Sequence, residues 1–150
     1  MTISDLKKRY FQFIKKQEST DEKFQDKYNQ LKNFYLPLCN KLFKLYKSKN
    51  RPILIGLSGS QGSGKSTISQ ILRIIFHSNF NLNVVCFSID DFYKTSSERK
   101  KISTSIHPLF MTRGVPGTHD SRMLYNTIKL LLKKNFHTIK IPKFDKSIDD

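Results

Sequence analysis

A glycine-rich segment carries the clearest chemistry in this 150-residue sequence. The run Gly59-Ser60-Gln61-Gly62-Ser63-Gly64-Lys65-Ser66-Thr67 contains the pattern G-x-x-x-x-G-K-[ST]. Glycines let successive backbone N–H groups converge on a phosphate, and a helix N-terminus behind them adds partial positive charge. We therefore expect all nine residues to bind a nucleoside triphosphate. In this binding mode Lys65 reaches the β- and γ-phosphates, Ser66 ligates Mg²⁺, and Thr67 lies near the α-phosphate.

Two adjacent aspartates form the second group with a recognisable chemistry. Asp90 and Asp91 directly follow the apolar run 84–89, and open α/β sheets hold their ligands beyond the carboxyl ends of the strands. A carboxylate at that place can accept the proton of an attacking hydroxyl during phosphoryl transfer. The alternative is a helix cap or a solvated turn.

Polar residues around a Gly-Val-Pro-Gly turn complete the set. Arg113 could clamp a carboxylate or a phosphate, and His119 could bind substrate, although single residues of either type are also common on surfaces. Asp120 is more simply the N-cap of a following helix.

Alternating strand and helix patterns surround these groups. Apolar runs at 53–58, 84–89 and 138–141 are typical of strands buried on both faces, while helical spacing follows the glycine-rich run and Asp120. Residues after Tyr93 read as a polar loop. The sequence therefore predicts an α/β fold, a P-loop NTPase-type parallel sheet with flanking helices, of which about three strands lie in this chain.

The first third of the chain is expected to be helical and to carry no motif. Aromatic and aliphatic residues recur every three or four positions, Ser19 and Glu22 fit a capping box, and Pro37 should kink or divide the second helix. We expect this stripe to pack against the domain that follows. The predicted organisation is a helical segment at 1–50 and part of a kinase-like domain at 51–150.

Composition excludes several classes of protein. The net charge is +15, from 27 basic and 12 acidic residues, but the basic residues are spread along the chain, so we expect no specific nucleic-acid partner. No apolar run reaches the roughly 18 residues of a membrane span, and no secretory signal is evident. Two cysteines without ligand spacing fit reduced thiols, so a cytoplasmic location with a small-molecule substrate is expected.

Four segments together resemble a known family, the P-loop D-glycerate 3-kinases of the uridine kinase, phosphoribulokinase and pantothenate kinase-like superfamily. They are the glycine-rich run, Ser-Ile-Asp-Asp-Phe-Tyr (88–93), Thr-Arg-Gly-Val-Pro-Gly-Thr-His-Asp (112–120) and Pro-Lys-Phe-Asp-Lys-Ser (142–147). The resemblance implies an enzyme, a transferase that moves the γ-phosphoryl group of ATP, with Mg²⁺, to a hydroxyl of a small metabolite, with D-glycerate first among the acceptors.

The resemblance also implies roles for individual residues. Asp90 is the expected base and Lys65 the second catalytic group, while the residues expected near substrate are Asp91, Tyr93, Arg113, His119, Lys143 and Asp145. Phe144 replaces a tyrosine that is usual in the family. The last motif ends near Asp150, so we expect a truncated kinase domain that binds nucleotide weakly and turns over little. Alternatives are a kinase for a nucleoside, a pantothenate-like or a sugar-phosphate acceptor, or an inactive nucleotide-binding remnant.

Overall fold

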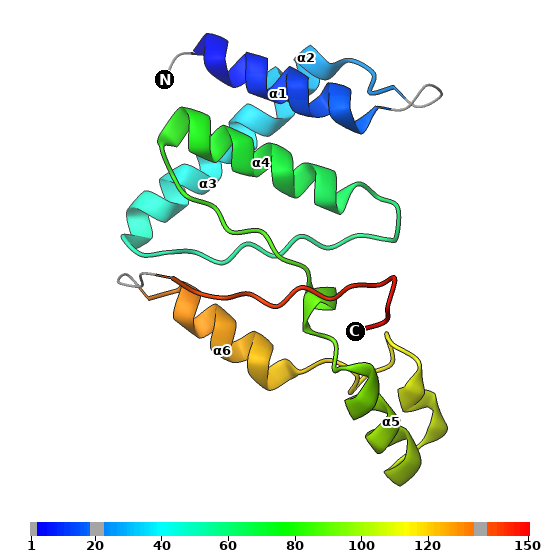
Figure 1. Cartoon of the computed structure of the whole chain (residues 1–150). Helices are drawn as coiled ribbons and strands as arrows, with labels where there is room; N and C mark the ends of the chain where they lie inside the picture. The colour runs from blue at the N-terminus through cyan, green and yellow to red at the C-terminus, as the bar shows by residue number, and fades with distance from the viewer. Residues whose placement is uncertain (1–2, 19–22, 134–137) are drawn as a thin grey trace. The chain divides into compact units, whose positions relative to one another are not determined.

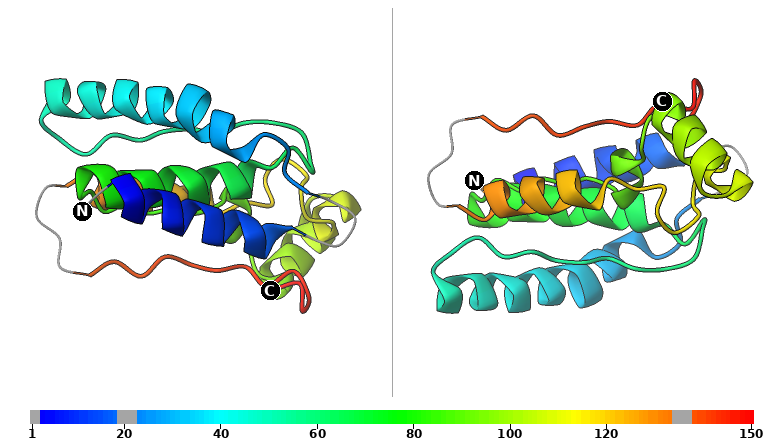
Figure 2. Two further views of the ribbon diagram at one scale, coloured as in Figure 1. Left: turned by 90° about the horizontal axis from the view of Figure 1, so that it is seen from above. Right: turned by 90° about the horizontal axis from the view of Figure 1, so that it is seen from below.

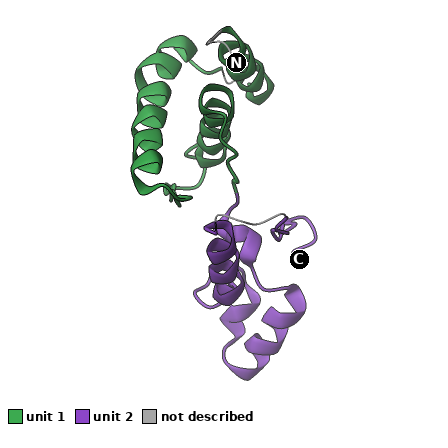
Figure 3. Cartoon of the chain, turned by 90° about the vertical axis from the view of Figure 1, so that its left-hand side faces the viewer, with its two compact units in different colours: residues 1–86 green, residues 87–150 purple. Residues whose placement is uncertain are grey.

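The computed structural model describes residues 3–18, 23–133 and 138–150. Two compact units divide the chain at residues 1–86 and 87–150 (Figure 3). These units are not the domains predicted from the sequence, and the boundary predicted at residue 50 stays a prediction.

Five helical elements make up the described part of the first unit. They are α1 (Ile3–Gln17), α2 (Lys27–Gln30), the π-helical turn η1 (Leu31–Tyr35), α3 (Leu36–Lys49) and α4 (Lys65–Phe80). Helix α1 lies along α4, as two perpendicular views show (Figures 1 and 2). The predicted capping box at 19–22 falls outside the described residues.

One apolar cluster joins these helices. Its buried members come from α1, from the η1–α3 region and from α4, and are Leu6, Tyr10, Ile14, Leu31, Tyr35, Cys39, Ile71, Ile75 and Phe76. The helical stripe of the first third of the chain therefore packs against the helix that follows the glycine-rich run, as predicted. Burying apolar area in this way is the main stabilising contribution in a unit made of helices.

Pro37 divides the second helical region as expected. It occupies the first turn of α3, and the π-helical turn η1 directly precedes it. The Leu36 N–H donates to the carbonyl of Leu31, five residues earlier. Because proline has no N–H and its ring clashes with the preceding turn, a regular α-helix cannot run through this position.

The predicted strands are the part of the fold that the structure leaves unconfirmed. The described residues form no strand, and the runs 53–58, 84–88 and 138–141 follow traces without helical turns, while Ile89 begins the 3₁₀ turn Ile89–Phe92 (Figure 1). Leu54 is 58% exposed and Ile55 45%, although the pattern predicted burial on both faces. A strand exists only through hydrogen bonds to a neighbour, and no described segment supplies that ladder, so the sheet remains a prediction.

Within residues 87–133 and 138–150, the second unit contains two helices and two 3₁₀ turns. In chain order they are η2 (Ile89–Phe92), α5 (Ser96–Ser105), η3 (Pro108–Met111) and α6 (Ser121–Leu131). The prediction of a loop after Tyr93 was wrong, because α5 begins there with a capping box: Thr95 accepts from the Glu98 N–H, and Glu98 accepts from the Thr95 N–H. The predicted cap of α6 is confirmed, since Asp120 accepts from the Met123 N–H at 2.8 Å.

The sequence predicts no membrane span, and the helices of the described residues can be compared with that prediction. No helix there combines the length and apolar character that a bilayer span requires.

Candidate functional site

The glycine-rich loop in the first unit has the backbone shape that its sequence predicted. Gly62 and Gly64 adopt φ values of 75° and 77°, in the left-handed region that L-residues with side chains adopt at a cost. Gly64 is the N-cap of α4, a helix of 16 residues. The loop therefore turns directly onto the N-terminus of a long helix, where partial positive charge favours an anion.

Gly59 is required for a different reason. A Cβ added there would lie 2.7 Å from the Ser63 hydroxyl oxygen and 3.7 Å from Cγ of Lys65. The first glycine thus makes room for two side chains of the same loop.

The Lys65 ammonium folds back over the loop. It donates to the carbonyl of Gly59 at 2.9 Å and to that of Ser60 at 2.6 Å. An ammonium group has three hydrogen-bond donors, and two of those of Lys65 bind backbone carbonyl oxygens. Phosphate oxygens can replace these carbonyls, because an anionic acceptor makes a stronger, charge-assisted hydrogen bond. The positive charge is therefore placed inside the loop before any ligand arrives.

Ser66 is the residue predicted to ligate a magnesium ion. It is exposed in the first turn of α4, next to Lys65. Among the described residues no group of three or more histidine, cysteine or acidic side chains gathers as a metal site. The single exposed hydroxyl of Ser66 fits Mg²⁺, because this ion keeps several waters and is held by one or two protein oxygens plus the substrate's phosphates. Thr67 is half-buried in the same turn.

Asp90 and Asp91 lie in η2, in the second unit, and have different partners. The Asp91 carboxylate accepts from the Ser88 N–H at 2.8 Å, while the Ser88 hydroxyl accepts from the Asp90 N–H. Asp91 therefore acts as a cap, the alternative that the sequence left open. Asp90 instead accepts from the Lys146 ammonium at 2.8 Å, which holds the pKa of the Asp90 carboxyl below its usual value.

A short antiparallel bridge joins the aspartate segment to the Gly-Val-Pro-Gly turn. The Lys94 N–H donates to the Thr118 carbonyl at 2.8 Å, and the Asp120 N–H donates to the Phe92 carbonyl at 2.7 Å. The rings of Tyr93 and His119 consequently stack with centroids 4.1 Å apart. Burial, and then the nearby Asp90 carboxylate, raise the pKa of Tyr93, so its hydroxyl stays protonated at neutral pH.

The Pro-Lys-Phe-Asp-Lys-Ser segment lies against the same group. Phe144 is 8% exposed, and its ring meets that of Tyr93 edge-on at 5.2 Å. The Arg113 guanidinium lies 5.7 Å from the centre of the Phe144 ring. Lys143 is solvent-exposed and pairs with Asp91 at 3.8 Å, an exposed contact that contributes little energy.

Asp145 is the predicted residue that the structure leaves apart from these contacts. Its carboxylate accepts from the Ser147 N–H and hydroxyl at 2.8 and 2.6 Å, and these bonds hold its pKa below the usual value. Asp145 thus shapes a local turn. Three of the other substrate-site candidates are linked through Phe144 within the second unit, namely Tyr93, Arg113 and His119. Asp91 and Lys143 instead pair with each other.

Three residues of this cluster were missed by sequence reasoning. Arg99 is 1% exposed and pairs with Asp149 at 2.5 Å, Asp149 also binds Arg113 at 3.0 Å, and Lys146 binds Asp90. Lys146 lies inside a segment that the sequence did single out. Arg99 and Asp149 belong to no quoted motif, and no spacing in the sequence connects two residues 50 positions apart.

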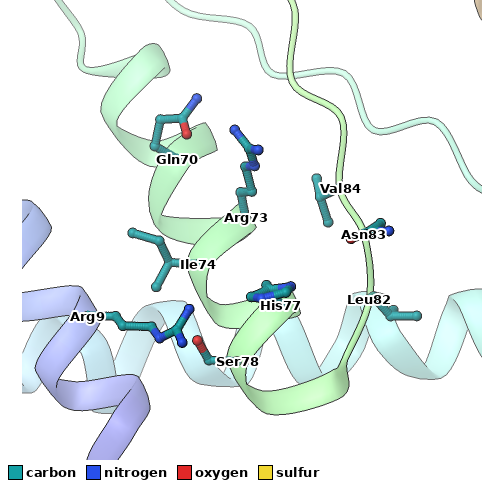
Figure 4. A pocket seen from close by; sticks show the side chains of 9 residues that line it. All are labelled: Arg9, Gln70, Arg73, Ile74, His77, Ser78, Leu82, Asn83 and Val84. Atoms are coloured by element: carbon teal, nitrogen blue, oxygen red, sulfur yellow. The ribbon is translucent and has the colours of Figure 1, made fainter. Parts of the chain in front are cut away.

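A hollow of about 380 Å³ elsewhere in the first unit is lined by none of the predicted site residues (Figure 4). Arg9 and Arg73 give it a basic character. Arg9 is partly neutralised by Asp5, 3.4 Å away.

Comparison with known proteins identifies kinases. No family model matches the chain. "Uncharacterized kinase mug58" of Schizosaccharomyces pombe is 40% identical over 108 residues, which cover 71% of this chain and 39% of that protein. "Probable ATP-dependent kinase TDA10" of Saccharomyces cerevisiae is 36% identical over 104 residues, 64% of this chain and 36% of that protein.

Two more distant relatives carry substrate names. "D-glycerate 3-kinase, chloroplastic" of Arabidopsis thaliana is 29% identical over 130 residues. "Pantothenate kinase" of Streptococcus gordonii is 29% identical over 136 residues. The chain spans less than half the length of each of these curated relatives.

A solved structure, described as that of the YGR205w protein, superposes with a TM-score of 0.63 at 30% identity. The match covers 75% of this chain and 41% of that structure. The homologues of this chain are therefore kinases of the P-loop uridine kinase and pantothenate kinase-like superfamily, and the resemblance read from the motifs is confirmed at that level.

Proposed function

We propose that the protein is an ATP-dependent kinase that transfers the γ-phosphoryl group to a hydroxyl of a small metabolite. One observation carries this proposal: the loop from Gly59 to Ser66 combines two left-handed glycines, an inward-folded Lys65 and the N-terminus of α4. That combination supplies backbone donors, a mobile cation and a helix terminus at one place, which a triphosphate requires. The kinase names of the relatives support the same reaction.

The proposed mechanism assigns one task to each group. Lys65 leaves the two carbonyls and follows the negative charge onto the γ-phosphoryl group. Ser66, together with the phosphates, would hold Mg²⁺, which would supply charge neutralisation. Lys65 belongs to the first unit and Asp90 to the second.

Asp90 is proposed to receive the proton of the acceptor hydroxyl. The carboxylate is ionised at neutral pH and can orient the hydroxyl, although the Lys146 contact that lowers the pKa of Asp90 also weakens it as a base. Its present partner is Lys146, with the ammonium at 2.8 Å, so the acceptor hydroxyl must share or replace that contact. As the acceptor oxygen bonds to phosphorus, ADP leaves and Asp90 holds the proton.

D-glycerate is the acceptor that we propose first. The support is the Arg-Gly-Val-Pro-Gly-Thr-His-Asp segment and the relative named D-glycerate 3-kinase. A pantothenate-like acceptor is the second candidate, because the relative named pantothenate kinase is equally similar. A cytoplasmic location without a specific nucleic-acid or membrane partner stays part of the proposal.

The decisive experiment compares two lysine variants. We expect Lys65→Ala to weaken ATP binding, measured with a fluorescent ATP analogue, by at least tenfold, because a charge-assisted contact contributes about 1.5–3 kcal/mol. Lys44→Ala, in an exposed part of α3, is the matched control and should bind as the unaltered chain does. Equal affinities for all three proteins would remove the phosphate loop from the proposal.

A coupled ADP-release assay then screens D-glycerate against pantothenate. Faster ADP release with pantothenate would replace D-glycerate as the acceptor but leave the kinase proposal standing. Tight, Lys65-dependent ATP binding with no ADP release in the presence of either acceptor would favour the alternative that the protein is an inactive nucleotide-binding remnant.

A further inference from the structure

Arg99 is a buried cation with more hydrogen-bond donors than partners. The side chain is 1% exposed, and its Nη2 group donates to the Asp149 carboxylate at 2.5 Å and to the Asp149 carbonyl at 3.0 Å. Among the described residues, nothing accepts from its buried Nε and Nη1 groups. Because unpartnered buried donors are destabilising, folding alone gives no reason to keep a full guanidinium here.

Arg99 and Arg113 hold a single carboxylate between them. One oxygen of Asp149 binds Arg99 at 2.5 Å, and the other binds Arg113 at 3.0 Å. Both guanidinium groups lie 5.7 Å from the centre of the Phe144 ring. Planar guanidinium groups match the geometry of a carboxylate, and an aromatic ring helps to hold them in place. We call this arrangement of Arg99, Arg113 and Phe144 the arginine clamp.

The two arginines of the clamp have one carboxylate as their shared ion-pair partner among the described residues. Asp90 is paired with Lys146 and Asp91 with Lys143, so Asp149 is the carboxylate that faces two arginines. Two guanidinium groups therefore share one carboxylate. A second anionic group, or a better-placed one, would therefore gain more from this cluster than Asp149 does.

Lys146 connects the arginine clamp to the proposed base. Its carbonyl accepts from Arg113 at 3.4 Å, and its ammonium donates to Asp90 at 2.8 Å. A small molecule with an anionic end at the clamp would therefore reach toward Asp90 with its other end.

We propose that the arginine clamp is the subsite for a carboxylate of the phosphoryl acceptor, and that Asp149 occupies it until the acceptor displaces it. Arg99 is then a specificity-determining residue that selects hydroxy acids over uncharged alcohols. That the bound carboxylate belongs to a phosphoryl acceptor rests on the proposed function. Carboxylate binding by the clamp needs no nucleotide, so it can be tested separately.

The test is a calorimetric titration of the full chain with D-glycerate, without nucleotide, at about 0.15 M salt. Asp149→Asn removes the internal carboxylate and should bind D-glycerate about tenfold more tightly. Asparagine suits this position because Asp149 has a φ of 59°, which asparagine tolerates as well as aspartate. Arg99→Gln should bind at least tenfold more weakly than the unaltered chain.

Lys100→Gln is the matched control. Lys100 is the exposed neighbour of Arg99 on α5, so this variant loses the same charge without touching the clamp and measures the non-specific attraction of a basic chain to anions. Its affinity should equal that of the unaltered chain. Arg99→Lys, which keeps the charge but loses the planar fork, should fall between the unaltered chain and Arg99→Gln.

Several outcomes would overturn the inference. It fails if Asp149→Asn binds D-glycerate no more tightly than the unaltered chain, and this result stands even if circular dichroism shows that Arg99→Gln does not fold. It also fails if Lys100→Gln weakens binding as much as Arg99→Gln does, or if inorganic phosphate binds Asp149→Asn more tightly than D-glycerate. Loss of Lys65-dependent ATP binding would leave these titrations unchanged and would refute only the proposed kinase function.

Discussion

Replacing Gly64 by alanine tests the phosphate loop most directly. Gly64 has a φ of 77°, and an added Cβ would meet nothing within 4 Å. Steric overlap with neighbours therefore plays no part, and the whole effect comes from the backbone. Holding an L-residue in the left-handed region costs about 1–2 kcal/mol.

A matched control isolates this backbone term. Gly56→Ala also adds a methyl group that meets nothing within 4 Å, but Gly56 is not in the left-handed region. Both variants lose the same chain entropy in the unfolded state, which for glycine to alanine stabilises by about 0.4–1 kcal/mol. The difference between the two variants is therefore the left-handed cost alone.

The cost must appear in one of two measurements. If the loop keeps its shape without nucleotide, the free energy of unfolding falls by about 1–2 kcal/mol relative to Gly56→Ala. If the free loop relaxes instead, ATP must restore the shape, and affinity falls by roughly 5- to 30-fold. Chemical denaturation and titration with a fluorescent ATP analogue measure the two shares, and their sum should be about 1–2 kcal/mol. Identical behaviour of Gly64→Ala and Gly56→Ala in both measurements would refute the reasoning.

Two predictions concern the core of the first unit. Burial raises the pKa of Cys39 to about 12, so alkylation of the native chain at pH 8 should modify the partly exposed Cys86 first, whereas equal rates would contradict the packing described for Cys39. Burial, followed by the nearby Tyr35, raises the pKa of Tyr10 from 10.0 to about 12. Because the folded pKa is the higher one, its contribution to stability is complete below pH 10 and is lost as the pH rises toward 12. In urea unfolding curves, the free energy of unfolding of Tyr10→Phe should fall less steeply between pH 10 and 12 than that of the unaltered chain. An equal fall in both proteins would count against this role of Tyr10.

Much of the candidate site could be read from the sequence because its parts are local. The loop from Gly59 to Ser66 is continuous, and glycines at the left-handed positions restrict its shape to what the pattern implies. Asp120 caps α6 three residues away. The family resemblance also selected segments that the structure brings together, since Tyr93 stacks on His119 and contacts Phe144.

Errors arose where a local signal was overlooked or where a pattern needed a partner. The capping box of Thr95 and Glu98 predicts α5, but the polar composition of that stretch suggested a loop. The apolar runs were read as buried strands, yet apolarity only permits a strand, and the ladder needs hydrogen bonds from another segment. The residues described here do not supply that segment.

Local chemistry in the sequence determined the helices, their caps and the phosphate loop, because each depends on residues within about one helical turn of one another. Tertiary structure alone decided that Arg99 is buried against Asp149, 50 residues away, and that Lys146 pairs with Asp90, 56 residues away. Such contacts depend on which segments lie side by side in the folded chain, and this cannot be predicted from the charges and spacing of residues along the sequence. For this reason the arginine clamp became visible only in the folded chain.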